Sequence, residues 1–152
     1  MIRIVLDTNV LITGVQDESS YSFRIIEACR QMKLQAVFNR SLLKENRQKS
    51  RELIREKAYL EILEDFYRKS KHIPHKTRVN VVKWDKEDNK LIEAAVDGKA
   101  GFIVTEDNDL LFLGEYKNIK MVKPQEFWRH FQAEDDNNGE WKDWVKGIMN
   151  GA

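Results

Sequence analysis

Apolar residues occur in short runs separated by polar segments, and the runs alternate between strand-like and helix-like patterns. Residues 2–6 and 101–105 are short and almost wholly apolar, with several β-branched side chains. Such runs are typical of strands buried on both faces of a parallel sheet. Further strands are expected over residues 35–38 and 119–122. Because helical patterns separate these strands, we expect an α/β fold with three layers, α/β/α, around a central parallel sheet.

Two helical regions are expected before residue 71. A polar segment ends at Ser19 and Ser20, either of which is a suitable N-cap for a helix over residues 21–32. From an expected N-cap at Ser41 to about Ser70 the pattern is helical almost throughout, which predicts a helical hairpin insertion with a break near residues 49–51.

The later part of the chain contains a further helix and several connections. Residues 71–78 are expected to connect the hairpin to a short strand or edge segment over residues 79–82. Acidic residues at 85–88 open a helix that Gly98 ends. A short helix is expected over residues 125–131 after the last strand.

Composition narrows the possible partners. The chain has 152 residues, of which 26 are basic and 25 acidic, so only a local patch could attract nucleic acid. The single cysteine, Cys29, excludes an internal disulfide and a cysteine-based zinc site. No apolar run is long enough to span a bilayer and no signal-peptide pattern is present, so we expect a cytoplasmic protein without a membrane partner.

We expect residues 1–132 to form one domain and residues 133–152 to form a C-terminal tail. Trp141, Trp144, Val145 and Ile148 in that tail lie at helical spacing, which predicts a short amphipathic helix. Such a helix would either pack on the domain as a lid or dock a partner.

Acidic residues follow both of the most apolar strands. Asp7 ends the first strand, and Asp107 and Asp109 follow the strand at 101–105. The carboxyl ends of parallel strands share one edge of the sheet, where ligands bind in open α/β folds. Helices that return across the sheet begin at that same edge. Asp88, and Glu45 near the start of the hairpin, are therefore expected in the same cleft.

Carboxylates gathered in this way require a cation. Two of them ~4 Å apart repel by about 4 kcal/mol at an effective dielectric near 20. Neither strand-end motif contains Lys or Arg, and hard oxygen ligands without thiolates or clustered histidines favour Mg²⁺ or Mn²⁺. Such ions commonly serve phosphoryl chemistry. The expected metal ligands are Asp7, Asp88, Asp107 and Asp109.

Each acid also has a purely structural interpretation. Asp7 could form a turn, and Asp107 or Asp109 could cap a helix. Asp88 could only complement a helix dipole. Glu45 could be a solvated charge on a charge-rich helix.

Five segments together resemble the PIN-domain nucleases, in particular the ribonuclease toxins of toxin–antitoxin pairs. The segments are residues 7–10, 41–45, 85–95, 104–111 and 122–127, and the resemblance covers about residues 1–131. It implies metal-dependent cleavage of RNA, a homodimer and often an antitoxin protein that blocks the cleft.

The resemblance also assigns roles to individual residues. It implies four catalytic acids, with supporting positions at Asn9, Thr105 and Asp109; the acids are Asp7, Glu45, Asp88 and Asp107. The chain departs from the family pattern at Glu106, where a small residue is usual, and in the polar residues 46–49.

A basic segment over residues 40–57 is the expected approach for RNA phosphates. Within it, Lys44 and Arg47 are the expected substrate contacts, together with Asn9 and Thr105 from the strand ends. These charges could instead solvate helix faces. For a second basic run, residues 68–78, neither contact with RNA nor simple solvation is preferred.

Three other functions are weighed against a nuclease. A haloacid-dehalogenase-type phosphatase would need a second Asp two residues after Asp7, where Asn9 stands, and a receiver domain would need acids before Asp7. A PIN-like module that only binds RNA or protein remains the alternative.

Overall fold

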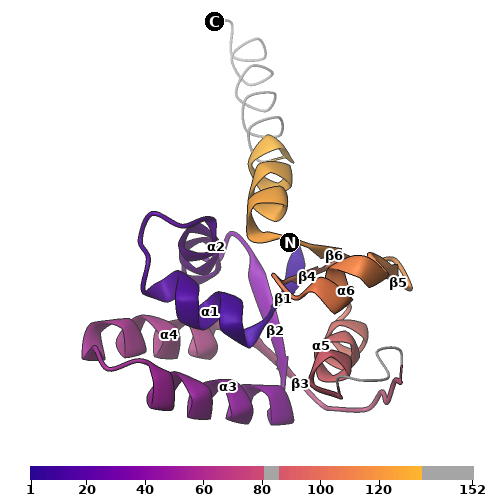
Figure 1. Cartoon of the computed structure of the whole chain (residues 1–152), viewed down its shortest axis with the longest axis horizontal. Coiled ribbons are helices and arrows are strands. Elements are labelled where there is room, and N and C mark those ends of the chain that lie inside the picture. Colours follow the sequence, from indigo (N-terminus) through magenta and orange to yellow (C-terminus); the bar gives the residue numbers. More distant parts are fainter. Residues whose placement is uncertain (81–85, 135–152) are drawn as a thin grey trace, which may run out of the picture.

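The computed structural model describes residues 1–80 and 86–134. Their strands form one six-stranded sheet in the order β3-β2-β1-β4-β6-β5 (Figure 1). All neighbours pair in parallel except β5 and β6, which are antiparallel. The strands are β1 (Arg3–Leu6), β2 (Gln35–Asn39), β3 (Lys71–Ile73), β4 (Phe102–Val104), β5 (Glu115–Tyr116) and β6 (Ile119–Val122).

Helices cover both faces of this sheet. The helices are α1 (Thr8–Val15), α2 (Tyr21–Arg30), α3 (Arg40–Leu53), α4 (Lys57–Lys69), α5 (Lys86–Asp97) and α6 (Asn108–Leu113), and residues 124–134 are also helical. α1, α2 and α4 pack against one another on one side, whereas α5 packs on β1, β2 and β4 from the other side (Figure 1). The predicted three-layer α/β/α fold with a central, mostly parallel sheet is confirmed.

The central strand shows why this sequence adopts a three-layer fold. Ile4, Val5 and Leu6 of β1 are all buried, although successive side chains of a strand point to opposite faces. A strand without a polar face needs cover on both sides, and the two helical layers supply it. Phe38 of β2 meets the rings of Phe66 and Tyr67 from α4 edge-to-face, at centroid distances of 6.0 and 5.5 Å.

The helical hairpin is present, but its landmarks differ from those predicted. The side chain of Asn39 caps α3 by accepting a hydrogen bond from the Leu42 amide at 2.8 Å, so the predicted cap at Ser41 is wrong. Ser50, placed in the predicted break, lies inside α3. Its hydroxyl bonds the Asn46 carbonyl at 2.7 Å and the Tyr67 hydroxyl at 2.9 Å, which satisfies a polar side chain within the helix. The break lies at residues 54–56, where Ile54 is extended and buried.

Three further elements differ from expectation. β3 lies within the predicted connection 71–78; as an edge strand it lacks an apolar pattern. Residues 8–15 form α1, for which no element is predicted above. β5 turns into β6 through Lys117 and Asn118, both at positive φ, as tight hairpin turns require.

Several predictions concern residues that the structure does not describe. Residues 79 and 80 of the expected strand are not in regular structure, and the rest of that strand, Asp85 and the tail from residue 135 lie outside the described residues. Helical residues continue past position 132 to at least 134, so the domain boundary stays a prediction.

Candidate active site

The sheet places two strand ends side by side. Leu6 of β1 is in register with Val104 of β4, and the Asp7 amide donates to the Val104 carbonyl at 2.9 Å. The next residues, Asp7 and Thr105, are therefore neighbours although they are 98 positions apart. The Thr105 hydroxyl donates to Oδ2 of Asp7 at 2.8 Å. Their contact fixes the first acid to the most rigid part of the fold.

Thr105 also fixes the acid that follows it. Its Oγ1 accepts a hydrogen bond from the Asp107 amide at 2.9 Å, and the side chain is fully buried. Asp107 then caps α6, because its Oδ1 accepts from the amides of Asp109 and Leu110 at 2.9 and 3.1 Å. Capping leaves Oδ2 of Asp107 for a ligand. The structural interpretation of Asp107 as an N-cap is thus correct, and it is compatible with a role in a site.

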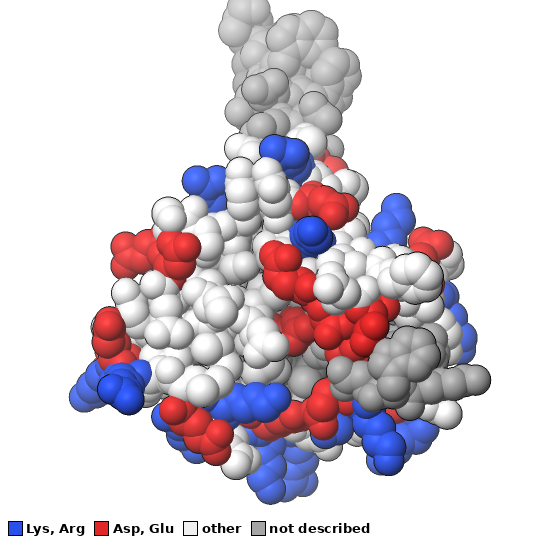
Figure 2. Space-filling model, viewed as in Figure 1, with Lys and Arg blue, Asp and Glu red and all other residues white. Residues whose placement is uncertain are grey.

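The acids from distant segments meet in one cavity of about 210 Å³. Figure 2 shows acidic side chains gathered in the region where Figure 1 places α5 and α6. One carboxylate oxygen from each of Asp88, Asp107 and Asp109 lies within 4.8 Å of the other two. Asp7 is not a member of this trio but lines the cavity with Asp88 and Asp107, whereas Asp109 does not line it. The lining residues are Asp7, Thr8, Asn9, Leu42, Glu45, Lys49, Glu87, Asp88, Leu91 and Asp107.

The electrostatics of the cavity favour a bound cation. Burial raises the pKa of Asp7 above its usual range, and the nearby Asp107 raises it further, against the hydrogen bonds from Thr105 and the Asn9 amide. Asp88 is only 5% exposed. Among the described residues, the acidic trio offers carboxylate oxygens alone, a donor set that suits a hard divalent ion.

A rim of paired charges borders the acids. Glu45 of α3 lies 3.6 Å from Lys49 and 3.4 Å from Lys90, and Lys90 lies 3.2 Å from Glu87. A hydrogen bond shared with Glu87 raises the pKa of Glu45, with burial acting in the same direction, while the pKa of Glu87 is lowered. Although burial acts against it, the two carboxylates raise the pKa of Lys90. Of the two carboxylates on this rim, Glu45 therefore holds a proton more readily than Glu87.

Sequence reasoning missed part of this rim. Lys49 was noted only as one of many basic residues, and Lys90 was not singled out. The available signal was helical spacing, since Lys49 lies one turn after Glu45, and Lys90 lies one turn after Glu87. Asn46 was also missed: it is buried, and its side chain contacts the Thr8 hydroxyl, which ties α3 to α1.

The predicted substrate contacts fall in different places. Asn9 lines the cavity and is exposed, whereas Thr105 is fully buried and its hydroxyl contacts Asp7. Contact of these two with substrate stays a prediction. Lys44 and Arg47 do not line the cavity. Lys44 is exposed, and Arg47 pairs with Glu64 at 3.2 Å and lies 5.6 Å from the Tyr67 ring. Contact of these two with RNA stays a prediction.

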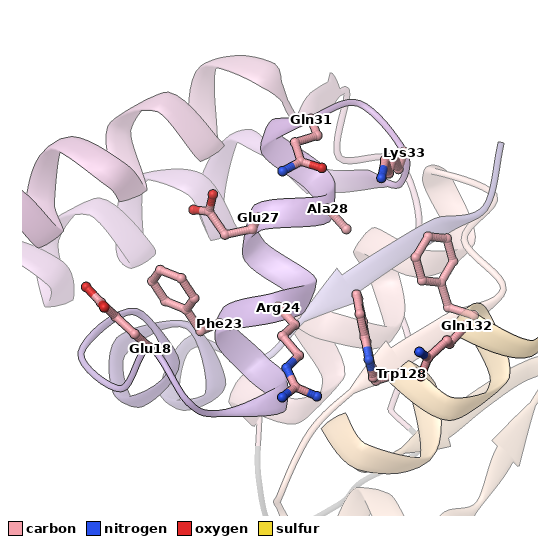
Figure 3. Close-up of a pocket in the computed structure, with 10 residues that line it drawn as sticks. Glu18, Phe23, Arg24, Glu27, Ala28, Gln31, Lys33, Trp128 and Gln132 are labelled. Carbon is pink, nitrogen blue, oxygen red and sulfur yellow. The ribbon is translucent and has the colours of Figure 1, made fainter. Parts of the chain in front are cut away.

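A larger hollow of about 430 Å³ lies between α2 and the helical residues 124–134 (Figure 3). Its lining mixes aromatic rings, such as Phe23 and Trp128, with charges of both signs, such as Glu27 and Arg24. No trio of acids converges there in the described part of the chain. Size therefore does not identify the chemical site, and we assign it to the smaller, acidic cavity.

Comparison with known proteins agrees with this geometry. Residues 3–109 match the PIN domain family. The chain is also 30% identical over 145 aligned residues to an uncharacterized protein of Methanocaldococcus jannaschii, with 86% of this chain and 92% of that protein covered. None of the described helices combines the length and apolar character needed to cross a membrane. The chain belongs to the PIN domain family, whose members are generally nucleases that use divalent metal ions.

Proposed function

We propose that the protein is a Mg²⁺- or Mn²⁺-dependent endoribonuclease that hydrolyses phosphodiester bonds of RNA. The observation that carries this proposal is the meeting of Asp88, Asp107 and Asp109 within 4.8 Å, two of which, Asp88 and Asp107, line one cavity with Asp7. These residues would hold the ion, which when bound would activate water and offset negative charge on the phosphate. Membership of the PIN domain family supports the same reaction class.

The chain's own residues position the reacting groups. Thr105 orients Asp7 through one hydrogen bond and fixes the Asp107 backbone through another. Glu45 lines the cavity with a raised pKa, so it is the carboxyl group of the rim that suits proton transfer. Lys49 and Lys90 place positive charge at the rim, where an anionic phosphate would enter.

A toxin function, an antitoxin partner, a homodimer and a cytoplasmic location extend this proposal. They are supported by the resemblance of the strand-end and helix-start motifs to toxin ribonucleases. None of them is needed for the chemistry of the cavity.

One observation favours a second candidate, a PIN-like module that binds RNA without cleaving it. Two lysines already lie beside Glu45 and offset part of the negative charge of the cavity. A metal ion is then less necessary for folding, and the acids could persist without catalysis.

The deciding experiment measures cleavage of a labelled RNA by purified protein with Mg²⁺, with Mn²⁺ and with a chelator. We expect cleavage only with metal, and its loss in Asp107→Asn. Asp65→Asn serves as the matched control and should cleave normally. It changes an acid of α4 that does not line the cavity. Equal cleavage in chelator, or full activity of Asp107→Asn, would contradict the proposal, whereas RNA binding without turnover in any metal would support the second candidate.

A further inference from the structure

One large apolar side chain of α6, the helix that carries Asp109, is left exposed to solvent. Phe112 of α6 is 94% exposed, more than any other large apolar side chain in the described part of the chain. The same helix buries Leu110 completely. A phenylalanine ring left in water forgoes the favourable free energy of burying its apolar surface. Folding therefore gives no reason for an aromatic side chain at this position.

The position of Phe112 connects it to the acidic trio. Asp109 and Phe112 are three residues apart on α6, so they lie on the same side of the helix with their Cβ atoms about 5–6 Å apart. Both ends of α6 are fixed, by the Asp107 cap and by a hydrogen bond from the Gly114 amide to the Leu110 carbonyl at 3.1 Å. The ring is thus held about one helical turn from an expected metal ligand.

The surrounding charge indicates what the ring can contact. Asp109, one helical turn away, is acidic and would repel a phosphate that is not bound to the metal. A nucleic-acid base is neutral and has a flat π-face, so it can approach the same surface. Exposed aromatic rings stack on unpaired bases of any sequence. An aromatic ring suits the acidic surface near Asp109, because a lysine or arginine at this position would pair with the acid instead.

We propose that Phe112 is a positioning residue that stacks on an unpaired base next to the cleaved phosphate. This inference rests on the proposed function. A base paired within a duplex is already stacked between its neighbours, so the ring would have no free face to contact. Stacking of this kind holds the strand in register without reading its sequence.

The test combines protein variants with altered RNA. Phe112→Ala removes the ring, Phe112→Leu keeps apolar bulk without a flat face, and Phe112→Trp keeps the flat face. The substrates are short single-stranded RNAs with one cleavage site and a single abasic residue moved along the strand. Because the ring is exposed, each variant should fold, which circular dichroism and thermal unfolding check.

We expect Phe112→Ala and Phe112→Leu to lower kcat/KM about tenfold through KM, the effect of one stacking contact of ~1.4 kcal/mol, and Phe112→Trp to retain activity. At one position beside the cleaved bond, the abasic residue should cost the wild type about tenfold but cost Phe112→Ala nothing more. Unchanged kinetics of Phe112→Ala, full activity of Phe112→Leu, or additive losses at every position would overturn the inference.

Two further measurements separate this inference from other outcomes. Light scattering compares the mass of wild type and Phe112→Ala; a smaller mass with unchanged cleavage would assign the ring to a protein contact and overturn the inference. Binding of the same RNAs to wild type in chelator is measured by fluorescence anisotropy. If no metal supports cleavage but the abasic effect on binding depends on Phe112, the proposed function fails and the stacking contact stands. If the wild type neither binds nor cleaves, both fail.

Discussion

Two aspartates, Asp7 in the acidic cavity and Asp65 at the contact between α2 and α4, occupy opposite electrostatic environments. Burial among other acids raises the pKa of Asp7. Hydrogen bonds from Arg30 and then Lys69 lower the pKa of Asp65, at distances of 2.8 and 3.1 Å. The carboxylate of Asp65 has cationic partners within the chain and needs nothing more, whereas that of Asp7 is placed where an external cation would relieve it.

The opposite pKa shifts of Asp7 and Asp65 separate functional from structural acids in this molecule. Asp65 contributes to holding two helices together, and its loss should affect stability. Asp7 is held in a costly environment by β1 and Thr105, which is typical of sites where function takes precedence over stability. Substitution of Asp7, of Asp65 and of their partners tests this contrast.

The largest effect is expected on catalysis. Asp7→Asn should lower the RNA cleavage rate by at least about 100-fold, because it removes one of the charges that the metal needs. Without metal, the free energy of unfolding of Asp7→Asn should not fall, since the substitution removes a buried charge that is disfavoured. Asp65→Asn should show the reverse, with normal cleavage and lower stability. Single-turnover kinetics and urea unfolding of both variants check this, and equal cleavage rates for the two would remove the contrast.

Metal binding should stabilise only a protein with an intact acidic cavity. At a Mn²⁺ concentration of 100 times Kd, the wild type should gain about 2.7 kcal/mol in the free energy of unfolding. Asp65→Asn should gain the same, and Asp107→Asn should gain little. Thermal unfolding with and without Mn²⁺ measures the gain. An equal gain in Asp107→Asn would place the ion elsewhere.

The orientation of Asp7 should depend on one hydroxyl. Thr105→Val removes the hydrogen bond to Asp7 and the acceptor for the Asp107 amide, so we expect a 10- to 100-fold loss of metal affinity or activity, as for other residues that orient metal ligands. Thr105→Ser keeps the hydroxyl and should recover most of it. Titration calorimetry with Mn²⁺ and cleavage assays compare the two. If Thr105→Ser is as impaired as Thr105→Val, the hydroxyl alone does not orient Asp7 and the prediction is wrong.

The smallest effect concerns pH. Because the pKa of Asp65 is lowered in the folded state, its contribution is present above its usual value of 3.8 and is lost as the pH falls below it. Asp65→Asn should therefore cost about 0.5–1 kcal/mol at pH 7, the size typical of accessible ion pairs, and almost nothing near pH 2. Urea unfolding at both pH values checks this. A cost that does not change with pH would show that packing, rather than charge, links α2 to α4.

Prediction from sequence succeeded where local patterns were strong. The wholly apolar runs located β1 and β4, and the rule that parallel strands end at one edge brought Asp7, Asp88 and Asp107 to one cavity. Tertiary contacts decided what was missed. β3 has no apolar pattern because it lies at an edge, and Ser50 was mistaken for a break because its buried partner, Tyr67, is on another helix.

Local sequence patterns could not predict the ion pairs on the rim of the cavity, for a related reason. Lys90 meets Glu45 across a gap of 45 positions, so only the assembled fold shows that the lysine faces an acid. Likewise, the sequence marks Phe112 as apolar but does not show that it is exposed. Only the packing of Leu110 into the core reveals that the neighbouring ring points away.

The order of strands in the sheet has a consequence during synthesis. β1 is made first, yet its partner β4 begins at residue 102, and β6 follows at 119. Asp7 has no Thr105 to hold it until residue 105 has left the ribosome. The acidic cavity therefore cannot assemble on a nascent chain before β4 and the residues that follow it have been synthesised.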